Sequence, residues 1–282
     1  MIGSRQYRLG MQTTFPDGTA IPRIGLGTWP MDDDEAAVVI AEAIDLGYRL
    51  VDTAFAYGNE VGVGRGVKAS SVPREDVFIT TKFNRHSHSV DGVAEAWTES
   101  ARKLGVDYID LMLIHWPNPD QDRYVEAWEG LIALREQGKV HHIGVSSFLK
   151  EHLDRIIDAT GVVPELNQLQ INPRHIQADT VALDDELGIV SQSWSPLGQG
   201  NDLLDEPLFA DLANTYSCTP GQVVLAWHLS FVQTAIPKSA NRERLMLNLR
   251  SAEIALNRAD IARINAMDGT ELDVKHPNEF MH

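Results

Sequence analysis

Cysteine is nearly absent from this sequence, which has Cys218 as its single cysteine among 282 residues. No disulfide within the chain is therefore possible, and so few thiols are typical of proteins from reducing compartments. The opening residues contain no apolar core of signal-peptide length, and no apolar run approaches the length needed to span a bilayer. We therefore expect a soluble protein of the cytoplasm.

Positive charge is also scarce, because 24 lysine and arginine residues stand against 40 aspartate and glutamate residues, for a formal net charge of −16. Such a chain repels nucleic acid and anionic membranes, and we expect neither as a partner. A phosphorylated ligand would then require a local basic patch. Basic side chains gather within 13 positions at Lys238, Arg242, Arg244 and Arg250. They indicate a phosphate site, with an ordinary solvated helix face as the alternative.

Short apolar runs alternate with helical patterns along most of the chain. The predicted strands are 49–54, 77–82, 108–114, 140–145, 165–171, 189–194, 234–238 and 252–255. Several are apolar on both faces, as in a parallel sheet buried under helices. Eight strands alternating with helices predict a (β/α)8 TIM barrel that forms a single domain over residues 1–282. We expect an N-terminal β-hairpin at about 11–27, turning at Asp17-Gly18, and a C-terminal tail at about 270–282.

An open, doubly wound sheet is the competing fold, and it usually carries a glycine fingerprint in its first strand–helix turn. That fingerprint is missing here. Gly62, Gly64 and Gly66 imitate it weakly, but they follow a predicted helix start and not the end of a strand. We interpret them as the small-residue face of a helix that packs close to the barrel.

Polar side chains stand at the ends of seven predicted strands, where the active site of a TIM barrel lies. Four of them, at or just after the first three strand ends, form a chemical set: Asp52, Tyr57, Lys82 and His115. A nearby ammonium lowers the pKa of a tyrosine, which is otherwise a poor acid at neutral pH. Asp52 can keep Lys82 charged, and His115 can bind a substrate oxygen or relay a proton.

Such a set can protonate a carbonyl oxygen, but it supplies no hydride, so a reduction would need a cofactor. Each residue also has a structural explanation: a capping carboxylate, a surface tyrosine, a solvated lysine or a core histidine. The pairs His86/His88 and His141/His142 have no further ligands at a suggestive spacing, and we expect no metal site.

The sequence resembles the aldo-keto reductases from about Thr14 to about Gly269. The segments that carry the resemblance are GLGTW (25–29), GYRLVDTAFAYGNEVGVGRG (47–66), ITTKF (79–83), LGVDYIDLMLIHWP (104–117), IGVSSF (143–148), LNQLQINP (166–173), SWSPLGQG (193–200) and IPKSANRERLMLN (236–248). The short segments after Ser195 and Gly269 are similar to those of the compact prokaryotic branch related to 2,5-diketogluconate reductases.

The resemblance implies a catalytic tetrad in which Tyr57 is the general acid, Lys82 paired with Asp52 lowers its pKa, and His115 orients the carbonyl. It also implies NADPH/NADP+ as the cofactor. The implied cofactor-binding residues are Ser146, Ser147, Gln168 and Trp194 for the nicotinamide, Ser195, Leu197 and Gly198 for the pyrophosphate, and Lys238, Ser239, Arg244 and Asn248 for the 2′-phosphate and adenine. An apolar substrate pocket is expected from Trp29, Phe55 and Trp116, with the 276–282 tail beside it.

Three positions depart from the pattern of the family. Ser147 stands where Asn is usual, Asn172 where a His before Pro is common, and Leu247 where a Glu near the adenine is common. Contacts to the carboxamide and the adenine are weaker as a result, while the phosphate-binding residues remain. We still expect NADPH to be preferred over NADH.

The sequence therefore predicts an NADPH-dependent enzyme that reduces aldehydes and ketones to alcohols, acting on a small-molecule carbonyl substrate as a monomer. One alternative is a barrel that binds NADPH as a sensor or regulatory subunit with negligible turnover. Another is an aldolase that forms a Schiff base on Lys82, although this leaves the patch around Lys238 unexplained.

Overall fold

The computed structural model describes residues 12–280, so residue 11 of the predicted hairpin and residues 281–282 of the tail lie outside it. The β-strands are β1 (Gln12–Thr14), β2 (Ala20–Pro22), β3 (Leu26–Gly27), β4 (Leu50–Asp52), β5 (Phe78–Phe83), β6 (Ile109–Ile114), β7 (Val140–Ser146), β8 (Leu166–Gln170), β9 (Val190–Trp194) and β10 (Thr234–Ala235). The α-helices are α1 (Asp33–Leu46), α2 (Glu60–Ala69), α3 (Val90–Leu104), α4 (Tyr124–Glu136), α5 (Lys150–Thr160), α6 (Ala178–Leu187), α7 (Pro207–Tyr216), α8 (Pro220–Phe231), α9 (Arg242–Arg250) and α10 (Arg258–Asn265).

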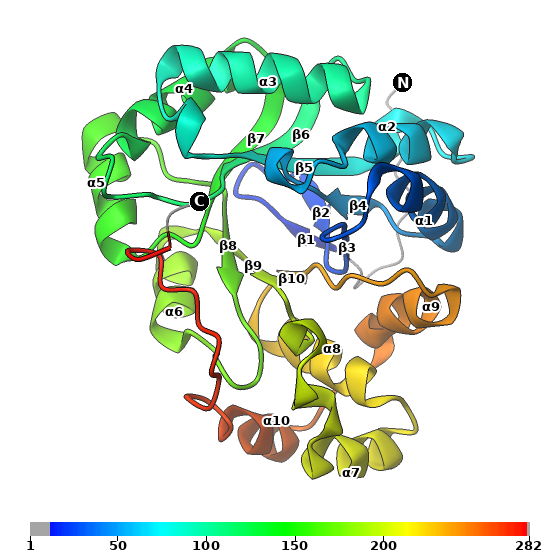
Figure 1. Ribbon diagram of the computed structural model, residues 1–282. Helices are drawn as coiled ribbons and strands as arrows, with labels where there is room; N and C mark the ends of the chain where they lie inside the picture. The colour runs from blue at the N-terminus through cyan, green and yellow to red at the C-terminus, as the bar shows by residue number, and fades with distance from the viewer. Residues whose placement is uncertain (1–11, 281–282) are drawn as a thin grey trace.

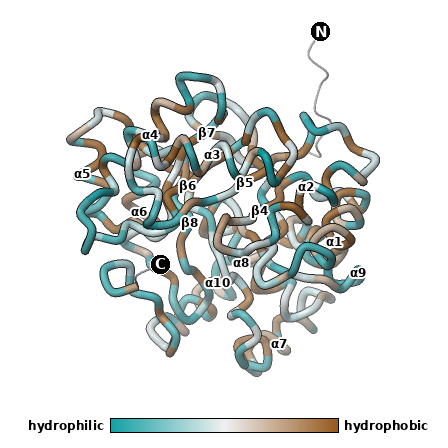
Figure 2. The backbone as a smooth tube through the Cα atoms, turned by 45° about the horizontal axis from the view of Figure 1, so that its top comes forward, coloured by the Kyte–Doolittle hydropathy of each residue, from teal (hydrophilic) through white to brown (hydrophobic). Residues whose placement is uncertain are grey.

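Strands β3 to β10 form one parallel sheet of eight strands in chain order, and helices surround it (Figures 1 and 2). The sheet closes between its first and last strands. The backbone N–H of Gly25 donates to the carbonyl of Ala235 at 2.9 Å, and that of Ala235 donates to the carbonyl of Arg23 at 2.9 Å. The predicted (β/α)8 barrel is confirmed.

The predicted strand at 252–255 is wrong, because Ser251–Glu253 form a 3₁₀ turn. The eighth strand is instead β3, inside the range that the sequence assigned to the hairpin. A strand of two residues is too short to show an alternating pattern in the sequence. The glycines of this segment determine where β3 lies. A Cβ on Gly25 would lie 2.6 Å from the Cγ of Leu50, and one on Gly27 would lie 2.8 Å from the carbonyl oxygen of Ile236. Close approach to both neighbouring strands therefore requires these glycines.

The hairpin of β1 and β2 is antiparallel, as predicted. It packs against the amino ends of the barrel strands, since Ile21 clusters with Phe78 and Leu166, the first residues of β5 and β8. Phe15, in its turn, stacks on the ring of His142 with centroids 4.2 Å apart. Phe15 joins an apolar cluster that includes Leu50, Leu113 and Leu166. The amino half of the barrel is thus filled with apolar side chains, which leaves polar chemistry to the carboxyl half.

Capping residues set the helix boundaries. Asp32 accepts hydrogen bonds from the backbone N–H groups of Asp34 and Glu35 at the start of α1, and Gly47 ends that helix with a φ of 116°. The glycines of α2 face other helices, since a Cβ on Gly62 would lie 2.1 Å from the carbonyl oxygen of Asp33. Their predicted packing against the barrel is therefore wrong.

Among residues 12–280, no helix is both long enough and apolar enough to cross a bilayer.

Asp184 on α6 is fully buried and connects this helix to the sheet. Its carboxylate accepts a hydrogen bond from the hydroxyl of Ser191 on β9 at 2.8 Å and one from the amide of Asn167 on β8 at 3.2 Å. Asn167 in turn donates to the carbonyl of Phe148, in the loop that follows β7. Burial raises the pKa of Asp184 to about 7, although both hydrogen bonds lower it.

We predict that Asp184→Asn removes a pH dependence from the stability of the protein. The folded carboxyl keeps its proton up to pH about 7, whereas the unfolded one loses it near 3.8. The wild-type free energy of unfolding therefore falls as the pH rises between these values. Asparagine stays neutral, and its amide can accept from Asn167 and donate to Ser191.

Urea unfolding at pH 5 to 8 measures this difference. The variant should be more stable than the wild type by about 2–4 kcal/mol at pH 8, with the difference shrinking toward pH 5. Asp185→Asn, at an exposed position of the same helix, is the matched control and should follow the wild type. Parallel curves for wild type and Asp184→Asn would contradict the prediction.

Candidate active site

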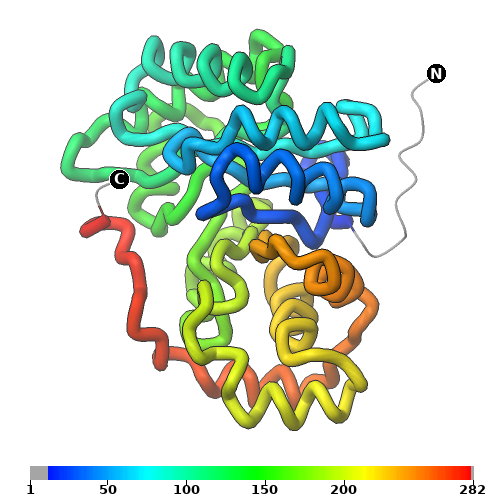
Figure 3. Tube along the Cα trace, turned by 45° about the vertical axis from the view of Figure 1, so that its right-hand side comes forward, coloured from blue at the N-terminus to red at the C-terminus, as the bar shows by residue number. Residues whose placement is uncertain are grey.

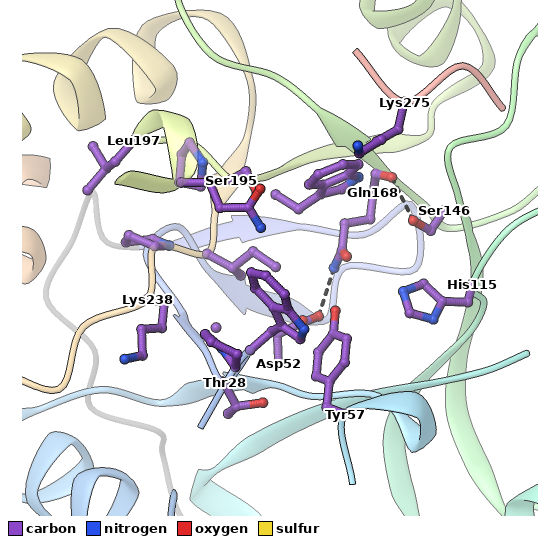
Figure 4. A pocket seen from close by; sticks show the side chains of 18 of the residues that line it. Thr28, Asp52, Tyr57, His115, Ser146, Gln168, Ser195, Leu197, Lys238 and Lys275 are labelled. Atoms are coloured by element: carbon purple, nitrogen blue, oxygen red, sulfur yellow. Dashed lines mark hydrogen bonds between the residues drawn. The ribbon is translucent and has the colours of Figure 1, made fainter. Parts of the chain in front are cut away.

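A cavity of about 760 Å³ opens at the carboxyl ends of the barrel strands. It collects residues from strand ends that are far apart in the sequence, among them Asp52 at the end of β4, Ser146 at the end of β7 and Trp194 at the end of β9. In Figure 4, His115 and Ser146 lie toward one side of this cavity, and Leu197 and Lys238 lie toward the other. The cavity is therefore elongated across the rim of the barrel.

The floor of the cavity contains a buried ion pair. The ammonium of Lys82 donates to Asp52 Oδ1 at 2.5 Å and to the carbonyl of Thr53 at 2.9 Å, and both charged side chains are almost completely buried. The other carboxylate oxygen, Asp52 Oδ2, accepts from the amide of Gln168 at 2.7 Å. Adjacent strands β4 and β5 hold the pair in register. Lys82 lies beneath the cavity lining and is not part of it.

Tyr57 stands directly above this pair, in a 3₁₀ turn over Phe55–Tyr57 that ends at Gly58 with a φ of 68°. The ammonium of Lys82 donates to the hydroxyl of Tyr57 at 3.5 Å. Burial raises the pKa of Tyr57 above its usual value, and the nearby ammonium offsets this only in part. Lys82 thus lowers the pKa of Tyr57, as predicted, but burial outweighs this contribution.

Burial also opposes the positive charge of Lys82, but Asp52 and Tyr57 together raise the pKa of the lysine above its usual value. At neutral pH the site therefore holds an ammonium beneath a neutral phenol. Such a phenol has a proton to give, and the ammonium would stabilise the phenolate that remains.

His115 follows β6 and lies beside Tyr57, with the two rings edge to face and their centroids 5.8 Å apart. Its Nδ1 is 3.2 Å from the side-chain oxygen of Asn84, which fixes the plane of the imidazole. Sequence reasoning missed Asn84, although its place two residues after Lys82 on the same rim was a usable signal.

The predicted nicotinamide-binding residues are only partly gathered in the cavity lining, which includes Ser146, Gln168 and Trp194 but not Ser147. Both amide hydrogens of Gln168 are committed, since its Nε2 donates to Asp52 and, at 2.6 Å, to Gln192 Oε1. The side-chain oxygen of Gln168, Oε1, is thus the group of this amide that can accept a hydrogen bond from a ligand. Ser147 is buried in a left-handed backbone conformation with a φ of 60°.

Lys238 lines the far side of the cavity, together with Ser195 and Leu197. Its ammonium is 3.7 Å from a carboxylate oxygen of Glu35, and both side chains are partly exposed. The other four residues predicted to contact the cofactor do not line the cavity: Gly198, Ser239, Arg244 and Asn248. Ser239 is buried beside Lys238, while Arg244 is exposed on the first turn of α9.

Two of the three predicted substrate-pocket residues, Trp29 and Trp116, line the cavity, whereas Phe55 does not. The ring of Phe55 instead lies 3.9 Å from the ammonium of Lys103 on α3. Phe55 belongs to the same 3₁₀ turn as Tyr57. Because this turn directs Tyr57 toward the cavity, it directs Phe55 away from the cavity and toward α3.

Sequence reasoning missed several lining residues, namely Thr28, Pro30, Pro196, Gln199, Gly200, Ile236, Pro237, Asp273 and Lys275. The last two lie in the C-terminal segment, which the sequence placed beside the cavity only from residue 276 onward. Phe280, which belongs to that predicted tail, does line the cavity. The ring of Phe280 packs on Trp116 with centroids 4.5 Å apart. The segment therefore forms a wall of the cavity.

Comparisons with known proteins agree with this geometry. Residues 23–268 match the model of the aldo/keto reductase family. An aldo-keto reductase of Mycolicibacterium smegmatis is 42% identical over 257 residues, covering 90% of this chain and 92% of the relative. The methylglyoxal reductase DkgA of Escherichia coli is 41% identical over 265 residues, covering 94% of this chain and 96% of the relative.

Solved structures give the same result. A point mutant of Gox0644, in complex with NADPH, superposes with a TM-score of 0.90 at 41% identity, covering 95% of this chain and 98% of that one. An aldo-keto reductase of Bombyx mori in complex with NADP has a TM-score of 0.87 at 33% identity, covering 95% and 97% of the two chains. This chain belongs to the aldo/keto reductase family.

Proposed function

We propose that this protein is an enzyme that reduces aldehydes and ketones to alcohols with NADPH. The observation that carries the proposal is the phenol of Tyr57 above the buried Lys82–Asp52 pair, facing a cavity that extends to Lys238. The named activity of the relative from Escherichia coli, methylglyoxal reductase, is of the same reaction type. NADPH is also the ligand named for the similar structure of the Gox0644 mutant.

The donors and acceptors of the cavity fit a nicotinamide dinucleotide. The side-chain oxygen of Gln168 can accept a hydrogen bond from the carboxamide of the nicotinamide, and the nicotinamide ring can stack on the face of Trp194. Lys238 supplies positive charge for a phosphate at the far side. The buried hydroxyl of Ser147 has no partner among residues 12–280 and is a further candidate contact. When bound, NADPH supplies the hydride.

The residues of the chain supply the proton for the carbonyl oxygen and stabilise the negative charge that develops. Tyr57 gives its proton to the carbonyl oxygen as that oxygen becomes negative. Lys82 stabilises the resulting phenolate, and Asp52 keeps Lys82 charged. His115, oriented by Asn84, positions the carbonyl. Because these groups are already bonded to one another before substrate arrives, little reorganisation is needed during the reaction.

The substrate side of the cavity is bordered by aromatic side chains, with Trp29 and Trp116 among them. Such walls exclude water and accept aromatic, aliphatic or dicarbonyl compounds by shape rather than by specific bonds. We infer a broad range of small carbonyl substrates, with dicarbonyls included. We also infer that the protein is one barrel domain that works as a monomer in the cytoplasm, as its resemblance to the aldo-keto reductases implies.

The two alternatives have less support. No observation on residues 12–280 or in the comparisons favours a sensor without turnover. A Schiff-base aldolase requires a lysine that reaches the substrate with a free amine. Lys82 is fully buried and bonded to Asp52, Thr53 and Tyr57.

We predict that Tyr57→Phe lowers carbonyl reduction by about 10²- to 10⁴-fold, because the general acid is lost from the chemical step. The dissociation constant for NADPH should stay within about twofold, since the phenol contributes little to binding the ground state. NADPH absorbance measures turnover, and quenching of tryptophan fluorescence measures binding. Tyr216→Phe, whose hydroxyl binds Asp260 away from the cavity, should keep full activity. Undiminished turnover in Tyr57→Phe would remove the tyrosine from the mechanism.

We predict that Lys238→Ala weakens NADPH by about tenfold and NADH by less than about threefold, because only NADPH carries the 2′-phosphate. Fluorescence titration with both nucleotides measures the two affinities. Arg250→Ala is the matched control, since Arg250 is exposed on α9 and paired with Glu253. Equal losses for the two nucleotides would mean that Lys238 does not bind the 2′-phosphate.

A further inference from the structure

The segment that starts at the end of β8, residues 170–176, is bonded at every second residue to the C-terminal strap, which we define as residues 268–280. The Gln170 amide donates to the carbonyl of Asp273 at 2.8 Å, and the backbone N–H of Lys275 donates to Gln170 Oε1 at 2.8 Å. Asn172 Nδ2 donates to Glu271 Oε2 at 2.9 Å. The strap is thus fastened along this segment after it returns from α10 along one side of the molecule (Figure 3).

Arg174 is the strongest attachment point of the strap by number of bonds. Its carbonyl oxygen accepts from three successive backbone N–H groups of the strap, those of Gly269, Thr270 and Glu271, at 3.0, 3.2 and 3.1 Å. The strap then carries Asp273, Lys275 and Phe280 into the cavity lining. The main chain of Arg174 therefore sets where the substrate wall begins.

The side chain of Arg174 reaches in another direction, to the loop of residues 198–206. Its guanidinium donates to Asp202 Oδ1 at 2.6 Å and to Glu206 Oε1, and only 12% of the arginine side chain is exposed. The same loop supplies Gln199 and Gly200 to the cavity. This side of the cavity is the one that also holds Ser195 and Leu197, which we assign to the cofactor.

We propose that Arg174 is a positioning residue that couples the cofactor side of the cavity to its substrate side. Its guanidinium fixes the 198–206 loop, its carbonyl fixes the strap, and a single residue thereby links the two walls. A ligand that orders the loop also orders the strap. The inference rests on the proposed function, since it takes NADPH as the ligand on the loop side.

Arginine suits this position for a physical reason. A planar guanidinium donates to two carboxylates at once in fixed directions, whereas a lysine ammonium on a flexible stem does not. Arg174→Ala cuts the bonds to the loop but leaves the main-chain carbonyl that holds the strap. The link between the walls is lost while each wall keeps its other contacts.

Hydrogen exchange followed by mass spectrometry, with and without NADPH, tests the coupling directly. In the wild type, NADPH should slow exchange in peptides of the 198–206 loop and also of the strap. In Arg174→Ala the slowing should remain at Trp194 and its neighbours and disappear from the strap. The dissociation constant for NADPH and the KM for the carbonyl substrate should each rise by about three- to tenfold, with kcat changed less than about twofold.

Two further variants sharpen this test. The double variant Asp202→Asn, Glu206→Gln cuts the same link from the loop side and should reproduce Arg174→Ala, even if that variant folds poorly. Arg263→Ala removes another arginine that bridges two carboxylates, Asp211 and Asp260, outside the cavity, and should behave as the wild type.

Strap exchange that still responds to NADPH in Arg174→Ala, or that does not respond in the wild type, overturns the proposal. A wild type that binds NADPH without reducing carbonyls contradicts the proposed function and leaves the coupling in place. A wild type that turns over normally but shows no coupling contradicts only the inference about Arg174.

Discussion

The ion pair between Asp52 and Lys82 is buried inside the carboxyl half of the barrel, where two charges removed from water are stable only if their remaining hydrogen bonds are satisfied. Thr53, directly after β4, and Gln168, on β8, provide those bonds from opposite parts of the sheet. Closing the barrel is therefore what makes the pair possible. Removing either partner would leave the other charge buried without compensation, at a cost of about 3–5 kcal/mol.

Two kinds of structural element surround this pair: barrel strands, which carry catalytic groups, and irregular segments, which form the walls of the cavity. Asp52, Lys82 and His115 lie on or directly after barrel strands, whose backbone hydrogen bonds hold them rigidly. Tyr57 lies in the short 3₁₀ turn that follows β4. The cavity walls, by contrast, are the 198–206 loop and the C-terminal strap, which meet at the segment after β8. The closed sheet thus positions the catalytic groups, while the 198–206 loop and the strap, which are both bonded to the segment after β8, contact the ligands.

Much of this could be predicted from the sequence, because parallel strands share a rim and polar residues at their ends must meet there. Lys82 and His115 were found in this way. Phe55 was wrongly placed because a tight turn separates neighbouring side chains, and β3 was missed because close glycine packing, not a strand pattern, defines it. Most of the strap was missed since its position depends on bonds to Gln170, Asn172 and Arg174 that no local pattern reveals. The lowering of the Tyr57 pKa by Lys82 was predicted, but the larger effect of burial was not, because burial is not readable from spacing.

The barrel keeps Tyr57 as a neutral phenol above a charged lysine, ready to give a proton. Titration of this phenol in the protein without NADPH, by ultraviolet difference absorbance between the wild type and Tyr57→Phe, measures its ionisation. We expect Tyr57 to ionise above the ordinary tyrosine value of 10.0. Ionisation well below that value would show that the charge of Lys82 outweighs burial and that the phenol is not held neutral in this way.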